Sequence, residues 1–224
     1  MAPKYQFYNT TGKNLVQSRK SNIYYYQGDE ALDRIVDIHF KGYDWVLLWS
    51  YVNESDNPYS QKVTQETTLR VKSGEEYAQE FKVSAEFSGM KVSAKAEAGF
   101  EHKTFTEEET VRSTKREETY KVKPHSTVRV YQKVYRFKVD YWFKLDAWAT
   151  KWTVGNRGKD GALQVSSNIT VLANEFIQTG EELKGTGTLE VEAVKRAAEQ
   201  KNIKRLEDCT GRCQDYMRDN KISS

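Results

Sequence analysis

The chain has 224 residues, of which 35 are basic and 32 acidic, and its net charge of +3 comes from interleaved rather than clustered signs. A nucleic-acid groove needs a basic patch or stripe, so this distribution argues against one and we expect no nucleic-acid partner. The length allows one large or two small domains with a substantial core, and three prolines and thirteen glycines do not indicate disorder.

The first 60 residues are aromatic and irregular, and their start lacks the apolar segment of a signal peptide. No stretch of the chain approaches the roughly 18 consecutive apolar residues of a membrane-spanning helix. Residues 43–52, YDWVLLWSYV, form an apolar run that predicts a buried strand. Tyr24, Tyr25 and Tyr26 are consecutive, so at least one must point outward from a strand; they are candidates for contact with a receptor's sugar or lipid headgroup.

From Gln61 onward the chain alternates polar and apolar residues over long stretches. Residues 126–147, STVRVYQKVYRFKVDYWFKLDA, alternate without a break, which corresponds to a strand of more than about 60 Å. Ordinary strands have about 5 to 6 residues. The pattern therefore predicts a mainly β fold that is elongated, with long twisted antiparallel strands.

Residues 80–100, EFKVSAEFSGMKVSAKAEAGF, alternate strictly but contain few large apolar side chains. We predict a hairpin with its turn at Ser88 and Gly89, on which Phe87 faces Met90. One face is apolar and the other polar, as in a surface hairpin that covers a core. A helix is the alternative, because the apolar stripe also has helical spacing and alanine favours helices, although Gly89 would lie in its middle.

Beyond Glu192 the spacing of apolar residues is helical, so residues 193–224 are predicted to form a helical tail. Cys209 and Cys213 lie one turn apart if the segment is helical, or close a small disulfide loop if Gly211 breaks it. Two cysteines without a nearby histidine are weak evidence for a metal site.

Catalytic motifs are missing from the chain. The three histidines are far apart, and neither a nucleophile elbow, a zinc-binding helix motif nor a phosphate-binding glycine loop occurs. We therefore expect that the protein is not an enzyme, and that it has no catalytic residues, no metal and no cofactor.

The order of these parts resembles the aerolysin-like family of β-pore-forming proteins, above all its epsilon-toxin and mosquitocidal-toxin group and the lysenin-like pore module. A threonine-rich strand, the amphipathic insertion, a second Ser/Thr/Glu-rich strand and the long strand after VKPHSTVRV carry the resemblance, over roughly residues 60–190. The family often has two prolines where this chain has Pro124 and His125.

The resemblance implies a protein that is secreted or released in soluble form and then becomes inserted in a target membrane. It binds a membrane lipid or glycan receptor, forms a homo-oligomer and refolds its insertion into one hairpin of a shared transmembrane β-barrel, which lyses cells. The implied domains are an aromatic-rich region at 1–60 that serves receptor or membrane binding, a pore-forming module at 61–192 with its insertion hairpin at about 79–101, and the tail at 193–224.

Charge then sets the orientation of the hairpin, since a lysine facing mid-bilayer lipid costs roughly 2 to 4 kcal/mol. The side chains expected to line the pore are Glu80, Lys82, Ser84, Glu86, Lys91, Ser93, Lys95 and Glu97. Those expected to face lipid are Phe81, Val83, Ala85, Phe87, Met90, Val92, Ala94, Ala96 and Ala98. Each arm has about nine alternating residues, close to the roughly 9 to 11 of a transmembrane strand.

The tail has two interpretations. It is a propeptide removed by cleavage at Arg196 or Arg205, which end two basic pairs, or it is a helix docked permanently on the sheet. The function also has alternatives: a non-lytic lectin-like or lipid-binding module on the same fold, or an intracellular structural protein.

Overall fold

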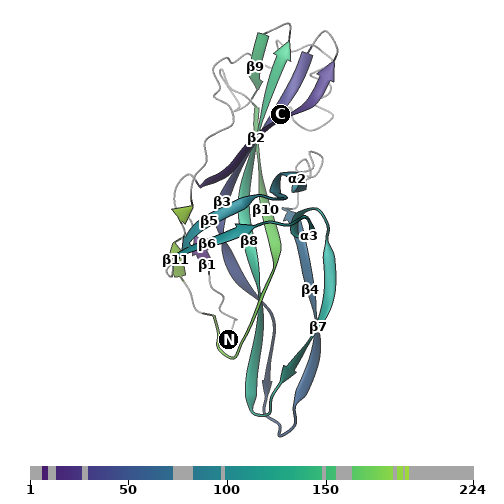
Figure 1. Cartoon of the computed structure of the whole chain (residues 1–224), viewed down its shortest axis with the longest axis vertical. Helices are drawn as coiled ribbons and strands as arrows, with labels where there is room; N and C mark the ends of the chain where they lie inside the picture. The colour runs from purple at the N-terminus through teal and green to yellow at the C-terminus, as the bar shows by residue number, and fades with distance from the viewer. Residues whose placement is uncertain are drawn as a thin grey trace.

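The computed structural model describes residues 7–9, 14–26, 30–72, 83–96, 99–147, 150–154, 163–183, 186–188 and 190–191. This part of the chain is mainly β, which confirms the predicted fold class. The molecule is long and narrow, because its longest strands run along most of its length (Figure 1). The predicted helical tail lies outside the described residues. Among the described residues, no helix is both long and apolar enough to cross a membrane.

A nine-stranded sheet forms the body of the molecule, in the order β11-β1-β3-β8-β10-β4-β7, with β2 paired to β3 and β9 paired to β8. Its described pairings are antiparallel except that of β1 with β11. The strands are β1 (Phe7–Asn9), β2 (Leu15–Tyr26), β3 (Glu30–Asn53), β4 (Tyr59–Val71), β7 (Thr114–Val122), β8 (Ser126–Ala147), β9 (Thr150–Val154), β10 (Leu163–Thr179) and β11 (Thr186–Thr188).

A smaller sheet of three strands, in the order β12-β5-β6, crosses one face of this body (Figure 1). Two single-turn helices flank it along the chain. These elements are α2 (Ser84–Phe87), β5 (Lys91–Ala96), β6 (Gly99–Thr104), α3 (Glu107–Thr110) and β12 (Glu190–Val191).

The 24-residue β3 and the 22-residue β8 form the backbone of the molecule. They pair from Glu30 opposite Ala147 to Asn53 opposite Ser126, with two irregularities. One irregularity lies at Gly42, whose φ of 120° is accessible to glycine but not to most residues. The limits of β8 coincide with the alternating run predicted at residues 126–147, and β3 contains the predicted strand at 43–52. Since β3 lies between β1 and β8, the described part of residues 1–60 shares one sheet with the region predicted to be the pore module.

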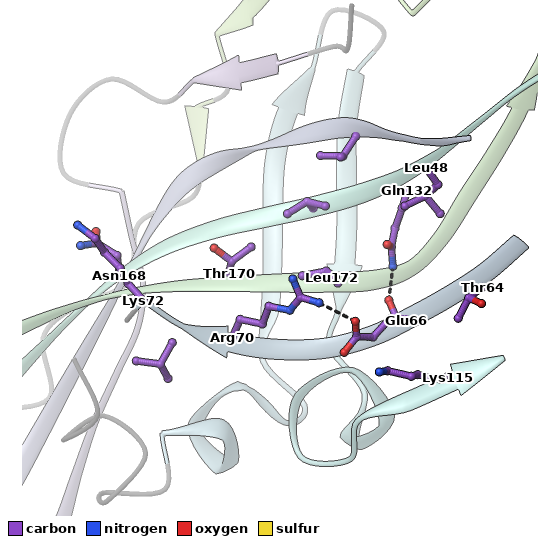
Figure 2. A pocket seen from close by; sticks show the side chains of 13 residues that line it. Leu48, Thr64, Glu66, Arg70, Lys72, Lys115, Gln132, Asn168, Thr170 and Leu172 are labelled. Atoms are coloured by element: carbon purple, nitrogen blue, oxygen red, sulfur yellow. Dashed lines mark hydrogen bonds and ion pairs between the residues drawn. The ribbon is translucent and has the colours of Figure 1, made fainter. Parts of the chain in front are cut away.

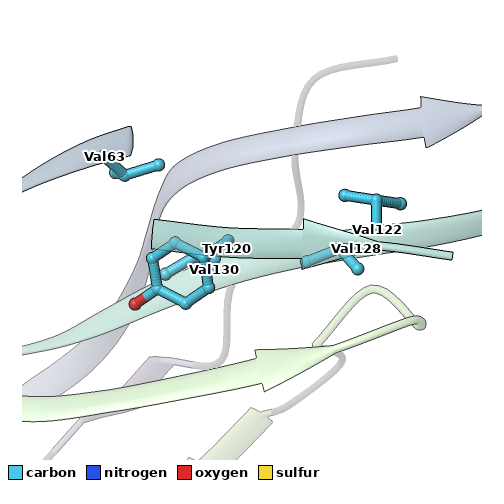
Figure 3. Packing of buried hydrophobic residues seen from close by; sticks show 5 residues of the cluster. All are labelled: Val63, Tyr120, Val122, Val128 and Val130. Carbon is cyan, nitrogen blue, oxygen red and sulfur yellow. The ribbon is translucent and has the colours of Figure 1, made fainter. Parts of the chain in front are cut away.

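Strands β4 and β7 form a ladder that packs over one end of β3 and β8. It runs from Tyr59 opposite Val122 to Thr67 opposite Thr114. The inner face of the ladder packs against β8 through a buried apolar cluster (Figure 3). The members of this cluster are Val63, Tyr120, Val122, Val128 and Val130. Burial of this apolar surface holds the ladder in place, while its outer face is largely exposed.

The hairpin predicted around Ser88 and Gly89 differs from the one in the structure. Residues 84–87 form α2, and the next residues make a turn in which the Met90 N–H donates to the Phe87 carbonyl at 3.0 Å. The backbone of Ser88, with φ −62° and ψ 123°, and the φ of 73° at Gly89 match a type II turn. Type II turns do not match the twist of a hairpin, so the flanking segments diverge. The hairpin instead joins β5 to β6, with Ala96 opposite Gly99.

Candidate functional site

The insertion, residues 72–113, connects the two strands of the β4–β7 ladder and contains α2, β5, β6 and α3. Its described part lies across the face of β3, β8 and β10 (Figure 1). Its location between two paired strands means that it could leave this face without breaking the ladder that anchors it. This segment is the candidate functional site.

Aromatic side chains anchor the insertion to the sheet. The Phe87 ring contacts Phe137 edge-to-face with 5.0 Å between centroids. The Phe105 ring contacts Tyr135 and Phe137 in the same manner, at 5.1 and 5.5 Å. Such pairs stabilise by about 0.5 to 1.5 kcal/mol each beyond the burial of their area. The two phenylalanines flank the turn and β5–β6, so they hold both ends of the hairpin region.

Between the anchors, the apolar layer under the hairpin is thin. Val92 and Ala94 of β5 are buried, and a partly open pocket of about 220 Å³ lies beside them, Phe40 and Tyr43. Charged side chains line the same pocket, among them Lys133 of the sheet. Contacts between the hairpin and the sheet are therefore partly polar.

Most of the described side chains expected to face lipid are buried against the sheet in this conformation. The buried ones are Val83, Phe87, Met90, Val92 and Ala94. Ala85 is exposed because it lies on the outer side of α2. Phe81, Ala98 and the side chain of Ala96 lie outside what is described.

The side chains expected to line the pore differ in their exposure to solvent. Lys91 and Lys95 are exposed, and Ser84 and Ser93 are half-buried. Glu86 is buried, contrary to the exposed position that strand alternation predicts for it, because the helical turn of α2 directs it inward. The remaining members, Glu80, Lys82 and Glu97, lie outside the described residues.

Glu86 is also a point of attachment to β2. Its carboxylate lies 3.9 Å from the Arg19 guanidinium, and its backbone carbonyl accepts a hydrogen bond from the side chain of Gln17. Detaching α2 from the sheet therefore breaks polar contacts as well as the Phe87 contact.

An ionic network joins the insertion to β8 and β10. Its members are Glu101, Lys103, Glu109, Lys133 and Glu175. Lys133 of β8 contacts Glu101 of β6 at 2.8 Å and Glu175 of β10 at 3.5 Å. Lys103 of β6 contacts Glu175 at 2.8 Å and Glu109 of α3 at 2.6 Å. Because each lysine contacts two carboxylates, the network ties β6 and α3 to the sheet as one unit.

Burial and hydrogen bonding shift the pKa values of two members of the network and of the neighbouring Tyr135. Burial opposes the charge of Lys103, but hydrogen bonds to Glu109 and Glu175 outweigh it and raise the pKa of the lysine. Burial also opposes ionisation of Glu109, but hydrogen bonds from Lys103 and from two backbone amides hold the pKa of its carboxyl below the usual value. Burial, reinforced by Glu175, raises the pKa of Tyr135 beyond the physiological range, so this tyrosine is a neutral donor to Glu175 at 3.2 Å.

Sequence reasoning missed this network, although one signal for it was available. On the face of β8 that meets the insertion, Lys133 falls between Tyr131 and Tyr135, and Phe137 and Val139 follow. A lysine in such an apolar row has a side chain only 8% exposed here, so it needs carboxylate partners. The alternation of β8 therefore indicated that Lys133 is buried and ion-paired. The carboxylates that pair with it lie on other strands, and the sequence did not identify them.

A second attachment is the edge pairing of β5 with β12, in which Ala94 lies opposite Val191. The segment just before β12 is β11, which pairs with β1 of the main sheet. The hairpin is thus linked to the body by backbone hydrogen bonds at one edge.

Of the other candidate residues, the three tyrosines lie on β2, away from this site. Tyr24, Tyr25 and Tyr26 form the end of β2, opposite Leu32, Ala31 and Glu30. Arg196, Arg205, Cys209 and Cys213 lie outside the described residues. Within the described part of the chain, no group of three or more His, Cys, Asp or Glu residues could hold a metal ion.

No family model matches the chain, and no curated protein matches it. Two solved structures are similar. The crystal structure of the oligomeric pore-forming toxin pro-Monalysin shares 11% identity over 85% of this chain and 75% of that chain, with a TM-score of 0.37. The crystal structure of the parasporin-2 Bacillus thuringiensis toxin that recognizes cancer cells shares 12% identity over 74% and 77%, with a TM-score of 0.17. Both are structures of toxins, but the likeness is low, and the proposed function rests on this chain's own residues.

Proposed function

We propose that the protein is a pore-forming cytolysin, which binds a target membrane, oligomerises and inserts one β-hairpin from each protomer into a shared transmembrane barrel. The insertion, residues 72–113, supplies the hairpin. The observation that carries the proposal is that the inward face of the β4–β7 ladder, if both strands are extended, becomes the face of the insertion that carries its apolar side chains.

The phase follows from the pairing of the ladder. In β4 the inward side chains are Val63, Gln65 and Thr67, and in β7 they are Tyr120 and Val122. The inner face therefore consists of odd positions on the first strand and even positions on the second. The apolar stripe of the insertion likewise occupies odd positions on the first arm, such as Phe81, and even positions on the second arm, such as Val92. The inward face of each ladder strand therefore continues as the apolar face of the arm that follows or precedes it.

Continuing the ladder unchanged makes this concrete. The pairing of Thr67 with Thr114, extended residue by residue, brings Phe81 opposite Phe100, Ala85 opposite Ala96 and Phe87 opposite Ala94. A slip of one residue would place lysines on the lipid side instead, because strand side chains alternate between faces. The agreement of register and pattern supports a hairpin that grows directly from β4 and β7.

The same extension defines the tip. Its centre falls between Met90 and Lys91, and the tip includes Ser88 and Gly89, two residues nearer the start of the chain. The positions expected to line the lumen, from Glu80 to Glu86 on the first arm and from Lys91 to Glu97 on the second, all share the polar side. By symmetry about this centre, the tip takes Met90 and Val92 from the lipid-facing set and Lys91 and Ser93 from the lumen-facing set.

Energetics favour a shared barrel over a single inserted hairpin. An open strand edge in lipid leaves backbone groups unsatisfied at several kcal/mol each, so hairpins from several protomers must close a barrel. The apolar side chains that leave the sheet, such as Phe87 and Val83, are those that come to face lipid, so their burial is exchanged rather than lost. The ionic network and the β5–β12 pairing hold the insertion until this exchange occurs.

The tail is proposed to restrain the change until cleavage at Arg196 or Arg205. The support for this is its position in the chain, since it follows β12, which pairs with β5 of the insertion.

A reversible disulfide tests the proposal. Directly opposite residues of antiparallel strands have Cα atoms about 4.5 to 5.5 Å apart, which suits a disulfide. Ala94→Cys with Val191→Cys, in a chain whose natural cysteines are replaced by serine, ties β5 to β12. After limited trypsin treatment to cleave the tail, we expect the oxidised protein to bind membranes without releasing dye from liposomes or erythrocyte ghosts, and reduction to restore release.

The matched control is Ser60→Cys with Lys121→Cys, an exposed opposite pair in the β4–β7 ladder. This pair stays together in both conformations, so its oxidation leaves release unchanged. Undiminished release by the oxidised Ala94–Val191 variant contradicts the proposal. Binding without release by the untethered protein on every membrane, both before and after limited trypsin, favours the non-lytic lectin-like or lipid-binding module instead.

A further inference from the structure

A groove lies on the face of the sheet opposite the insertion, between β4 and the strands β3, β8 and β10 (Figure 2). Its volume is about 750 Å³. Gln132 and Val134 of β8 line it, and they alternate with Lys133 and Tyr135, which contact the insertion on the other face. Apart from Lys72, the first residue of the insertion, the groove is therefore separate from the candidate site.

The floor of the groove is apolar although it is open. It is formed by Val46, Leu48, Val134 and Leu172, which come from three strands, and all but Val134 are only half-buried. Gln132 is the polar exception, but its amide is occupied, since it donates to the carbonyls of Glu66 and Ala173 at 2.7 and 3.0 Å. The floor thus offers a continuous apolar surface and few hydrogen-bonding groups.

The rim of the groove is positively charged. Arg70, Lys72 and Lys115 line it together with one carboxylate, Glu66. Glu66 is paired with Arg70 at 2.6 Å, whereas Lys72 and Lys115 are exposed and have no ion-pair partner among the described residues. Two cationic side chains are therefore available to a ligand.

One end of the groove is formed by Lys72 and Asn168, with Thr170 and Arg70 next along it (Figure 2). Leu172 lies further along, and Leu48 lies at the far end with Gln132, Glu66, Thr64 and Lys115. The Lys72 end combines cations with hydrogen-bonding side chains, and the surface beside it is apolar. The ligand that matches this arrangement has an anionic head and an apolar tail.

We infer that this groove binds an anionic membrane phospholipid, with the headgroup near Lys72, Asn168 and Thr170 and an acyl chain along the apolar floor. A purely polar anion leaves the floor wet, a neutral lipid leaves the lysines without a counter-charge, and a zwitterionic lipid places its own cation beside them. The inference rests on the proposed function, because it names the lipid that such a pore-former holds before insertion.

The direct test uses soluble single-chain lipids. Isothermal titration of the whole protein compares lysophosphatidic acid below its micelle concentration with lysophosphatidylcholine and with inorganic phosphate. We expect saturable binding of lysophosphatidic acid, with weaker or no binding of the other two. Equal binding of lysophosphatidylcholine overturns the role of the rim, and equal binding of phosphate overturns the role of the floor.

Charge variants locate the site. Lys72→Glu with Lys115→Glu is expected to weaken binding of lysophosphatidic acid at least about fivefold, since a basic residue near an anionic lipid surface contributes about that factor and Lys72 is the one that lies at the headgroup end. The control, Lys121→Glu with Lys123→Glu, has the same charge change at exposed positions outside the groove. An equal loss in the control, or no loss in the groove variant, contradicts the inference. Lys72→Gln with Lys115→Gln should lose less.

Sedimentation with vesicles separates this inference from the proposed function. The oxidised Ala94–Val191 tether should still sediment with vesicles that contain phosphatidylserine, and much less with pure phosphatidylcholine vesicles. Lipid-dependent sedimentation by an untethered protein that never releases dye retains the inference and rejects the pore. Dye release that the groove variant leaves unchanged rejects the inference and retains the pore.

Discussion

At the scale of single residues, Glu109 concentrates several interactions in one carboxylate. Its side chain is 1% exposed and accepts hydrogen bonds from Lys103 at 2.6 Å and from the backbone amides of Thr106 and Asn174 at 2.9 Å each. The Thr106 contact is half of a capping box for α3, and the Asn174 contact reaches β10. One side chain thus caps a helix of the insertion and fastens it to the sheet.

We predict that Glu109→Gln lowers the free energy of unfolding by about 2 kcal/mol at neutral pH, because hydrogen bonds to a charged group stabilise by roughly 1.5 to 3 kcal/mol. The pKa of Glu109 is lowered in the folded protein, so its contribution is present above the usual glutamate value. The contribution is lost as pH falls through the lower folded value. The difference between wild type and variant should therefore begin to shrink below about pH 4, where the unfolded chain binds a proton at this position, and disappear below the lowered folded pKa.

Thermal unfolding at a series of pH values checks this prediction. Glu117→Gln is the control, since Glu117 belongs to an exposed pair with Lys62 at 3.3 Å and such pairs contribute little. A Glu109→Gln curve parallel to wild type at all pH values would contradict the assignment of the acid-labile contribution to Glu109.

At the scale of elements, the same residues belong to two different hairpins. In this structure β5 and β6 pair with Ser93 opposite His102, and the Ser93 hydroxyl lies 2.9 Å from Nδ1 of His102. In the proposed hairpin, the extended β4–β7 register places Ser93 opposite Ser88 and His102 opposite Gln79. Insertion therefore requires β5 and β6 to separate and become one arm.

A disulfide across the present pair tests this rearrangement. We predict that Ser93→Cys with His102→Cys, oxidised, blocks dye release, and that reduction restores it. The reason is geometric, because two residues nine positions apart on one extended arm lie about 30 Å apart and no disulfide spans that distance.

The outcome separates two ways of inserting. Unchanged release by the oxidised Ser93–His102 variant means that β5 and β6 enter the membrane as the hairpin seen here. The register derived from β4 and β7 is then wrong, while pore formation itself stands. The Ser60–Lys121 disulfide again serves as the silent control.

At the scale of the whole molecule, the proposed lumen combines balanced charges. Three lysines and three glutamates lie on the polar side of the hairpin, and they repeat around a barrel of identical protomers. The lysines are Lys82, Lys91 and Lys95, and the glutamates are Glu80, Glu86 and Glu97. Interleaved charges of both signs give no net field along the lumen.

We predict weak ion selectivity, measured as a reversal potential near zero across a planar bilayer with a salt gradient. Glu86→Gln with Glu97→Gln removes two acidic groups per protomer and should shift the reversal potential toward anion selectivity. Strong selectivity of the unmodified pore, of either sign, contradicts the proposed lining.

Much of the fold was predictable from the period of the sequence. A strand period of two, unbroken for twenty residues, is a local property, and it defined β8 to its end residues and the mainly β class. The insertion was also identifiable, because its alternation carries few large apolar groups. The turn at Ser88 and Gly89 was identified as a turn, but its type depends on backbone angles that the dipeptide alone does not determine.

What the sequence determined by itself is the alternation of faces, and with it which side chains of the insertion share a face wherever the segment is extended. The helical turn of α2, which buries Glu86 and exposes Ala85, was not part of that pattern. Only the tertiary structure decided where the hairpin closes, since the anchoring of Phe87 and Phe105 on the aromatic face of β8 competes with local strand pairing. It also decided the partners of Lys133 and the groove beside Lys72. These features join residues distant in the chain, and such contacts arise from register and packing between strands, which no local pattern encodes.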